Sequence, residues 1–210
     1  MKKNTAYFVT AIGTNIGKTI VSSVLVNALK ADYWKPVQAG TDDLTDSDLI
    51  RATSDYTVFP EKYVLKKPAS PHQSAAEENI EIKLSDFVLP ESKRTLIIEG
   101  AGGMMVPLNV NGDLVSDIAV RFQLPLIIVS SFYLGSINHT LLTLEYAKKL
   151  NVRVALLVFN GVINEESLKA IKYFYPDIKT AFIPHLEFIT KESIQKLGEE
   201  FAQKYLNELE

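Results

Sequence analysis

The stretch that decides the fold runs from residue 10 to residue 19 and reads Thr10-Ala11-Ile12-Gly13-Thr14-Asn15-Ile16-Gly17-Lys18-Thr19. The apolar run at residues 7–10 predicts a strand before it, and the apolar spacing after it predicts a helix over about residues 17–30. A glycine-rich turn in this position can present successive backbone N–H groups to phosphate oxygens at the positive end of a helix. Lys18 is then placed to neutralise phosphate charge and the Thr19 hydroxyl to bind Mg²⁺. The stretch therefore predicts a phosphate-binding loop.

The strict pattern G-x-x-x-x-G-K-[ST] is not met, because Ile12 stands where the first glycine is expected. The alternative is an ordinary strand–helix turn with an exposed lysine. The strand, the turn, the Gly-Lys-Thr triplet and the helix all coincide here, which favours the phosphate-binding loop.

Further along the chain, short apolar runs alternate with longer amphipathic stretches. The predicted strands cover residues 33–37, 95–99, 126–129, 154–159 and 180–183, and the predicted helices cover 115–122, 136–150, 165–174 and 191–209. Continuous apolar strands suit a parallel sheet that is covered on both faces. The alternation predicts an α/β fold: a doubly wound, mostly parallel sheet flanked by helices, as in P-loop NTPases and other Rossmann-like proteins.

Composition limits the domain count and the chemistry. The 210 residues carry a formal net charge of −3 and no cysteine, and we expect one domain over residues 1–210. Within it, the polar, proline-punctuated residues 41–90 predict an irregular functional insertion. The absence of cysteine excludes disulfides, thiolate metal sites and cysteine nucleophiles. There is no basic stripe and no apolar run long enough to cross a bilayer, so we expect neither a nucleic-acid nor a membrane partner, and a cytoplasmic protein.

Acidic and basic side chains follow other predicted strands. Glu99 ends the strand at residues 95–98 and precedes a glycine-rich segment, and Lys35 follows another strand just before Pro36. Ligands gather at the carboxyl ends of the strands in open α/β sheets, so both residues are candidates for the phosphate site. Asp48, in an acidic loop, is a third candidate. The plainer alternatives are a capping Glu99, a surface Lys35 and a solvated Asp48.

Taken together, these segments resemble the dethiobiotin synthetase family of the P-loop NTPase superfamily. The resemblance covers nearly the whole chain and depends on the order and spacing of several short motifs. They are Gly17-Lys18-Thr19, Lys35-Pro36-Val37-Gln38-Ala39-Gly40, Ser47-Asp48, Pro68-Ala69-Ser70-Pro71-His72, Glu99-Gly100-Ala101-Gly102-Gly103, Leu134-Gly135-Ser136-Ile137-Asn138-His139, Asn160 and Ile183-Pro184.

The resemblance implies an ATP-dependent cyclo-ligase of biotin biosynthesis. Such an enzyme converts 7,8-diaminononanoate, CO₂ (or bicarbonate) and MgATP to dethiobiotin, ADP and phosphate through a carbamate and a carbamic–phosphoric anhydride. It also implies a homodimer in which each subunit helps to complete the substrate site of the other.

The resemblance assigns roles residue by residue. Lys18 and Lys35 match the catalytic lysines, and Thr19, Asp48 and Glu99 match the magnesium ligands. The ATP-binding set is Thr14, Asn15, Ile16, Gly17, Lys18, Thr19, Ile20, Asp48, Glu99, Gly100, Ala101, Gly102, Asn160, Pro184, His185 and Leu186. The substrate-binding set is Lys35, Ala39, Thr41, Pro71, Gly103, Gly135, Ser136, Ile137 and Asn138.

The chain departs from the family pattern at a few positions. The family has glycine where Ala11 stands, an acidic residue where Asn15 stands, and a substrate-binding serine where Ala39 stands. Thr41 could supply the hydroxyl that Ala39 lacks. The late acidic contact to the nucleotide has only Glu187 as a nearby counterpart.

Two other classes of protein share the phosphate-binding loop. Amide-forming relatives similar to cobyrinate diamide synthase usually carry a glutaminase domain with a catalytic cysteine, and this chain has no cysteine. Partitioning and metal-insertion ATPases normally carry a second lysine at the start of the loop, where this chain has Ala11-Ile12-Gly13.

Overall fold

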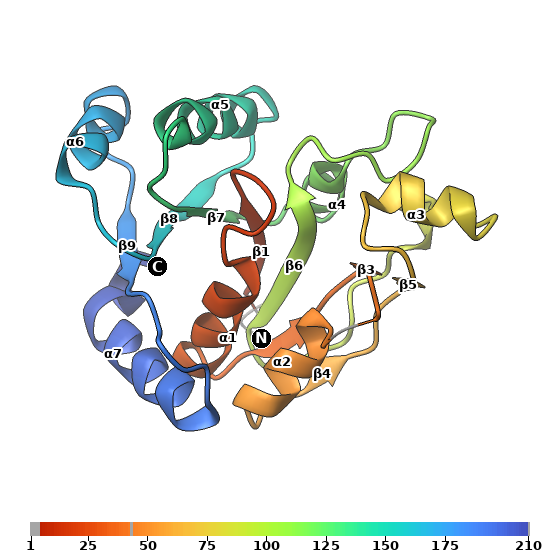
Figure 1. Cartoon of the computed structure of the whole chain (residues 1–210), viewed down its shortest axis with the longest axis horizontal. Coiled ribbons are helices and arrows are strands. Elements are labelled where there is room, and N and C mark those ends of the chain that lie inside the picture. The colour runs from red at the N-terminus through yellow and green to blue at the C-terminus, as the bar shows by residue number, and fades with distance from the viewer. Residues whose placement is uncertain (1–4, 43, 210) are drawn as a thin grey trace.

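The computed structural model describes residues 5–42 and 44–209. Within them, seven parallel strands form one twisted sheet in the order β4-β2-β6-β1-β7-β8-β9 (Figure 1). The strands are β1 (Ala6–Ala11), β2 (Asp32–Trp34), β4 (Val58–Phe59), β6 (Leu96–Gly103), β7 (Leu126–Ser130), β8 (Val154–Asn160) and β9 (Thr180–Ile183). A second, two-stranded parallel sheet pairs β3 (Val37–Ala39) with β5 (Tyr63–Leu65).

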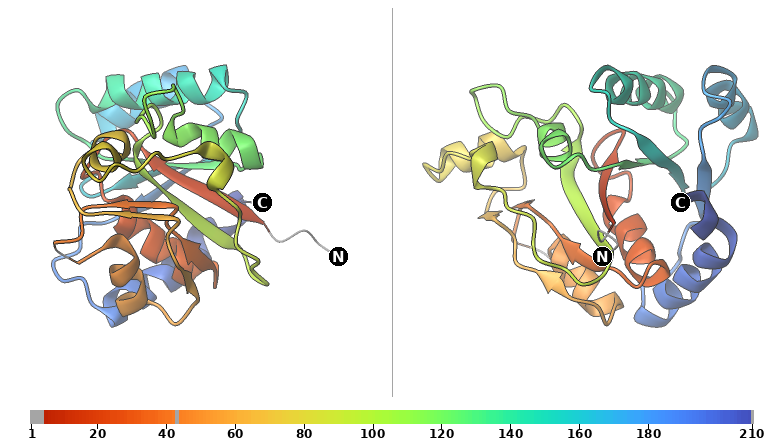
Figure 2. Two further views of the ribbon diagram at one scale, coloured as in Figure 1. Left: turned by 90° about the vertical axis from the view of Figure 1, so that its right-hand side faces the viewer. Right: turned by 180° about the vertical axis from the view of Figure 1, so that it is seen from behind.

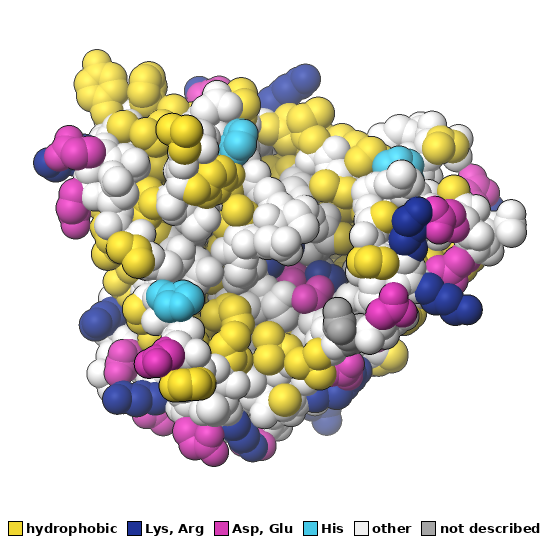
Figure 3. Space-filling view, in the orientation of Figure 1, with side chains coloured by type: hydrophobic (Ala, Val, Ile, Leu, Met, Phe, Trp, Pro, Cys, Tyr) yellow, Lys and Arg dark blue, Asp and Glu magenta, His cyan; other side chains and the backbone are white. Residues whose placement is uncertain are grey.

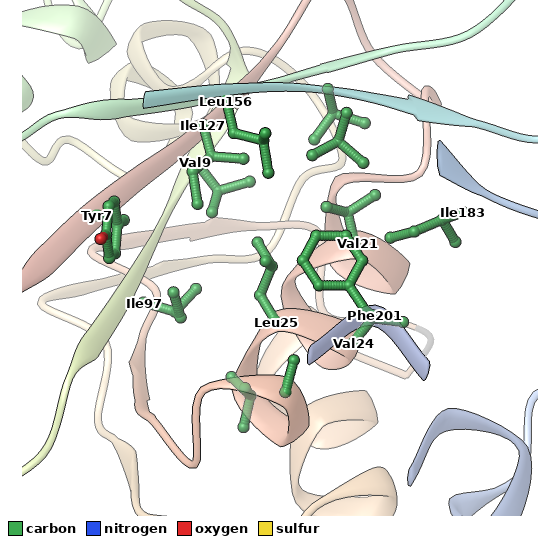
Figure 4. Packing of buried hydrophobic residues seen from close by; sticks show 14 of the residues in the cluster. Tyr7, Val9, Val21, Val24, Leu25, Ile97, Ile127, Leu156, Ile183 and Phe201 are labelled. Atoms are coloured by element: carbon green, nitrogen blue, oxygen red, sulfur yellow. The ribbon is translucent and has the colours of Figure 1, made fainter. Parts of the chain in front are cut away.

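Helices cover both faces of the large sheet, as the left-hand view in Figure 2 shows. One face carries α1 (Lys18–Ala28), α2 (Asp46–Thr53) and α7 (Lys191–Leu209), and the other carries α3 (Pro71–Glu77), α4 (Val115–Phe122), α5 (Ser136–Lys149) and α6 (Glu165–Phe174). A single turn of 3₁₀ helix, η1 (Leu84–Asp86), precedes β6. Each face buries its own apolar cluster. The cluster under α1 and α7 includes Val9, Leu25, Ile97 and Phe201 (Figure 4). Burial on both faces explains why the strands read as continuous apolar runs.

The strand order places the phosphate-binding loop at the switch point of the sheet. β1 lies between β6 and β7, and the chain winds to β2 on one side and to β7, β8 and β9 on the other. The connection that leaves β1 runs toward β2, and the connection that leaves its neighbour β6 runs the other way, toward β7. Connections that diverge in this way open a crevice at the carboxyl ends of the strands. The predicted α/β fold is confirmed, and α4, α6, α7 and β9 have the predicted bounds.

Two predictions about local structure were wrong. The single strand expected over residues 33–37 is two strands in different sheets, because the chain turns at Lys35-Pro36. Proline supplies no N–H for a continuous ladder, so the break falls where a lysine can leave the sheet. The stretch 41–90 is not irregular throughout, since it contains α2, β4, β5, α3 and η1. These elements are short, since the longest, α2, has eight residues, and so few residues show no clear periodicity. No helix of the described residues is long and apolar enough to span a membrane.

Candidate active site

The loop between β1 and α1 has the backbone of an anion-binding turn. Asn15 and Gly17 both have positive φ angles, of 58° and 91°. Gly17 caps α1, and the first turn of that helix holds no acidic residue. A Cβ at Gly17 would lie 2.1 Å from the amide nitrogen of Asn160, so the position has no room for a larger residue. The loop thus points free N–H groups of a helix terminus toward the cavity described below.

Lys18 lies folded within this loop. Its Nζ atom donates to the carbonyl of Gly13 at 3.4 Å, and the residue is 8% exposed. Burial lowers the pKa of Lys18 below its ordinary value, and the positive charge of Lys35 adds to that effect. A buried ammonium with one long hydrogen bond is short of negative partners. An anionic ligand in the cavity would supply them.

Four side chains meet beside Lys18: three come from α1, α2 and β6, and the fourth, Lys35, comes from the turn between β2 and β3. The Thr19 hydroxyl, in the first turn of α1, lies 2.5 Å from a carboxylate oxygen of Asp46 and 3.1 Å from Oε1 of Glu99. Lys35 completes the group: its Nζ lies 2.6 Å from Asp46, 3.1 Å from Glu99 and 3.3 Å from the carbonyl of Gly100. Two carboxylates, one hydroxyl and one ammonium therefore share a single polar centre beside Glu99 of β6.

The pKa shifts in this centre reflect its charge balance. Burial opposes the charge of Lys35, but Glu99 and Asp46 outweigh it and raise the pKa of Lys35 above its ordinary value. Burial likewise opposes the ionisation of Asp46, but Lys35 outweighs it and lowers the pKa of Asp46. Both groups are therefore charged at neutral pH.

Tyr33 forms a hydrogen bond to the polar centre from the protein core. Its hydroxyl donates to Oε2 of Glu99 at 3.0 Å, and both side chains are fully buried. Burial, reinforced by the charge of Glu99, raises the pKa of Tyr33 well above its ordinary value, so the phenol stays protonated and remains a donor.

The structure corrects the predicted place of one carboxylate. Asp48 does not reach Thr19 or Glu99: it accepts from the backbone N–H and the hydroxyl of Thr45 and pairs with Arg51 at 2.8 Å. It is thus the capping partner of α2, and Asp46 at the first helical position takes the expected place. Residues two apart on a helix point in nearly opposite directions, so only one of the two can face the site.

These groups line a cavity of about 850 Å³ at the carboxyl ends of the strands. Figure 3 shows the corresponding hollow, with acidic and basic side chains inside it. Of the predicted site residues, the cavity is lined by Thr14, Asn15, Gly17, Lys18, Thr19, Ile20, Lys35, Ala39, Pro71, Glu99, Ala101 and Gly102. Val37, Gln38, Leu44, Asp46 and the Pro68–Ser70 turn, among others, also border it.

Other predicted residues lie outside the lining. Ile16 is buried beneath the loop, Gly100 packs against the Phe8 ring, and Gly103 pairs with Ala11 in the sheet. Thr41 donates its N–H to the carbonyl of Lys66, just beyond the strands of the second sheet. Its proposed replacement of a missing hydroxyl at Ala39 stays a prediction.

The residues expected near the adenine lie on the far side of the loop. Asn160, at the end of β8, donates to the carbonyl of Ile16 at 3.1 Å. Pro184 and His185 follow β9 and border a separate cavity of about 520 Å³, whereas Leu186 packs against the α1–α7 core. The segment Gly135–Asn138 opens α5 and does not line the large cavity of its own chain. Its role in a partner subunit stays a prediction.

Sequence reasoning missed two residues of the polar centre. For Asp46 a signal was present: Thr45 and Asp48 have the spacing of a capping box, which assigns Asp48 to the helix terminus and leaves Asp46 free. For Tyr33 there was none, because an aromatic residue within an apolar strand looks like core.

The sequence of the chain is similar to those of known proteins. A family profile described as "AAA domain" matches residues 5–193. The chain is 52% identical over 175 residues to "ATP-dependent dethiobiotin synthetase BioD" of Cytophaga hutchinsonii, with 81% of this chain and 82% of the relative covered. It is 38% identical over 202 residues to the protein of the same description from Lawsonia intracellularis, with 95% and 98% covered.

Solved structures share the fold. A structure described as a plasmid partition protein from Borrelia burgdorferi B31 bound to AMPPNP covers 98% of this chain, and 99% of that chain is covered, with a TM-score of 0.61 and 12% identity. A ParA family ATPase from Chlorobium tepidum TLS covers 99% of this chain, and 95% of that chain is covered, with a TM-score of 0.51 and 12% identity. At such identity the likeness extends to the fold alone. The two sequence relatives carry the same description, and at 52% and 38% identity they show that this chain belongs to the ATP-dependent dethiobiotin synthetase family of P-loop proteins.

Proposed function

We infer that the chain is an ATP-dependent dethiobiotin synthetase, a ligase of biotin biosynthesis. The observation that carries the chemistry is the meeting of Thr19, Asp46, Glu99 and Lys35 beside the phosphate-binding loop. We place the reaction in the cytoplasm, where ATP is available.

The phosphate groups of ATP fit the loop between β1 and α1. The N–H groups that precede α1 bind phosphate oxygens, and the buried ammonium of Lys18 gains the negative partners that it lacks. We assign the adenine to the neighbourhood of Asn160 and Pro184, since both lie beyond the loop at the ends of β8 and β9.

The polar centre fits Mg²⁺. The atoms that could bind the ion are all oxygens, from Thr19, Asp46 and Glu99. The Thr19 hydroxyl lies within hydrogen-bond distance of both carboxylates, which brings the three groups together. Among the described residues, no three or more His, Cys, Asp or Glu side chains are placed to hold a metal ion together. Mg²⁺ typically takes only one or two protein carboxylates and completes its shell with phosphate oxygens and water, so two carboxylates suffice. When bound, the ion would neutralise charge on the outer phosphates.

The family resemblance implies a route of three steps. One amine of 7,8-diaminononanoate adds to CO₂ and loses a proton, which gives a carbamate. A carbamate oxygen then attacks the γ-phosphorus, and ADP leaves as the old P–O bond breaks. The second amine attacks the carbonyl carbon of the resulting anhydride, closes the ureido ring, and releases phosphate and a proton.

Lys35 acts on the side of the carbamate. It is a buried ammonium within the polar centre, and it lines the same cavity as Val37, Gln38 and Ala39. Its raised pKa keeps it charged, so it can stabilise the negative charge shared between carbamate and phosphoryl group. The backbone of β3 and the Pro68–Pro71 turn then form the wall against which the diamine lies.

We propose that the working unit is a homodimer that shares its substrate sites. Large apolar side chains are exposed on loops that follow three strands of the large sheet: Met105 after β6, Leu134 after β7 and Val162 after β8. Leu134 is fully exposed and directly precedes Gly135 at the start of α5. Apolar groups collected at one edge mark an interaction surface. The N-terminus of α5 would bind the substrate carboxylate of the partner subunit.

The deciding experiment measures phosphate release by the purified chain with MgATP. We expect release to require both diaminononanoate and bicarbonate, and to be matched by dethiobiotin detected by mass spectrometry. Lys18→Met serves as the inactive control. Hydrolysis that is indifferent to both substrates would favour a nucleotide switch of the partitioning type and would overturn the proposed function.

A further inference from the structure

The two carboxylate oxygens of Glu99 have separate partners. Oε1 accepts hydrogen bonds from Thr19 and Lys35, both of which line the large cavity. Oε2 accepts from the hydroxyl of Tyr33, which is not among the residues that line it. One oxygen thus faces the reaction centre while the other is tied to the core.

The sheet register explains how Tyr33 reaches this position. β2 and β6 are parallel neighbours, and Tyr33 pairs with Ile97. Alternate residues of a strand share a face, so Ile97 and Glu99 point to the same side, toward α1, and Tyr33 points there beside them. All three belong to or border the buried layer under α1, and Tyr33 and Glu99 are both 0% exposed.

We propose that Tyr33 is a positioning residue, which holds Oε2 of Glu99 so that Oε1 alone is presented to the Mg²⁺ of MgATP. The inference deepens the proposed function, since it takes Glu99 as a ligand of that ion. Terminal carboxylate torsions are broad, and a free carboxylate binds metals through one oxygen or two. Mg²⁺ demands near-octahedral geometry, so fixing one oxygen outside the shell favours this ion.

The role differs from that of a core aromatic. The ring of Tyr33 packs in the α1–α7 cluster and would do so equally well as phenylalanine. The hydroxyl is the group that hydrogen-bonds to Glu99, and Tyr33 touches neither nucleotide nor substrate in the proposed arrangement. Removing a hydrogen-bond partner of a metal ligand by mutation typically weakens metal affinity about 10- to 100-fold.

The test is Tyr33→Phe, with Tyr7→Phe as the matched control. Tyr7 is also a buried tyrosine, and it lies at the end of β1 that is away from the phosphate-binding loop (Figure 4). Its hydroxyl donates to the carbonyl of Leu209 at 3.0 Å. Mn²⁺ binding to the ADP complex, followed by electron paramagnetic resonance, needs no turnover. We expect Tyr33→Phe to weaken it roughly 10- to 100-fold and Tyr7→Phe to leave it within about twofold. ADP affinity in EDTA should stay unchanged in both variants, which also verifies the fold.

Two further measurements exclude a purely structural role. Raising the Mg²⁺ concentration should restore kcat in the Tyr33→Phe variant. A loss of stability alone would not produce such a recovery. In a Glu99→Gln background, Tyr33→Phe should cause no additional loss of Mn²⁺ affinity, because the tyrosine acts through that carboxylate. Unchanged Mn²⁺ affinity in Tyr33→Phe, or an additional loss in the double variant, would overturn the proposal. Mn²⁺–ADP binding involves neither diamine nor CO₂, so it can be read even if substrate-coupled turnover fails.

Discussion

The ammonium nitrogen of Lys35 lies 2.6 Å from a carboxylate oxygen of Asp46, although Lys35 follows β2 and Asp46 opens α2. The pair joins the two elements on either side of the Val37–Ala39 strand. It also ties the residue that we assign to the carbamate to one of the carboxylates that we assign to Mg²⁺.

Asp46 and Asp48 should respond differently to the same substitution. Asp46→Ala removes a carboxylate of the polar centre, so the Mg²⁺ concentration for half-maximal activity should rise at least about tenfold. Asp48→Ala removes only the cap of α2 and an ion pair whose carboxylate is 44% exposed, so it should leave the Mg²⁺ dependence unchanged. Its cost in unfolding free energy should be at most about 1 kcal/mol. Mg²⁺ titration of both variants checks the assignment, which equal Mg²⁺ dependences would contradict.

The lowered pKa of Asp46 predicts an acid-sensitive contribution to stability. Below its ordinary pKa the unfolded chain binds a proton that the folded site resists, so folding weakens as pH falls. The difference in unfolding free energy between wild type and Asp46→Asn should therefore be constant above about pH 5 and shrink below about pH 4. Urea unfolding of both proteins from pH 3 to pH 7 measures it. A difference that grows toward low pH would mean that Asp46 is not held as a carboxylate.

Lys35→Met should abolish turnover while MgADP still binds, because Lys18 and the loop hold the phosphates. The substitution also leaves Asp46 and Glu99 facing each other without a shared cation, and two such carboxylates resist joint ionisation. The variant should therefore lose unfolding free energy as pH rises from about 4 to 7, relative to wild type.

The matched control for this variant is Lys66→Met, since Lys66 is exposed on the surface. Phosphate release, MgADP titration and urea unfolding should all match wild type in that variant. A loss of MgADP affinity in Lys35→Met equal to that of Lys18→Met would place Lys35 with the nucleotide rather than with the carbamate.

Lys18→Met should separate function from stability. Burial lowers the pKa of Lys18, which means that the folded chain holds this charge at a cost to stability below its ordinary pKa. Its replacement by an apolar side chain of similar length should leave the melting temperature unchanged or raised. The same change should weaken MgATP binding roughly 10- to 150-fold, since a charge-assisted hydrogen bond contributes about 1.5–3 kcal/mol. Calorimetry of unfolding and of binding provides both values; a marked fall in melting temperature would show that the charge is satisfied within the loop.

Mixed dimers test the proposed sharing of sites. Lys35→Met and Asn138→Ala chains, each inactive alone, should regain activity together, because one site of a mixed dimer then has both wild-type residues. With random assortment, half of the dimers are mixed and half of their sites are intact, so about one quarter of the wild-type rate is expected. Native mass spectrometry confirms that mixed dimers form. If they form without activity, α5 serves the site of its own chain.

The sequence by itself determined whatever depends on local chain geometry. The loop at residues 10–19 and its Lys18 and Thr19 are set by consecutive residues between one strand and one helix. Glu99 could be predicted as well, because the end of an apolar strand in a parallel sheet faces the crevice. The helical spacing of apolar residues likewise predicted the bounds of α4, α6 and α7.

Only the tertiary structure decided which distant residues meet. Asp46 faces the site and Asp48 does not, because a helix turns about 100° per residue and Thr45 engages Asp48 as a cap. Tyr33 reaches Glu99 because the register of β2 against β6 sets them on one face, although paired residues of the two strands, such as Trp34 and Ile98, are 64 residues apart in sequence. Such pairings depend on the packing of the whole sheet, and no local pattern encodes them.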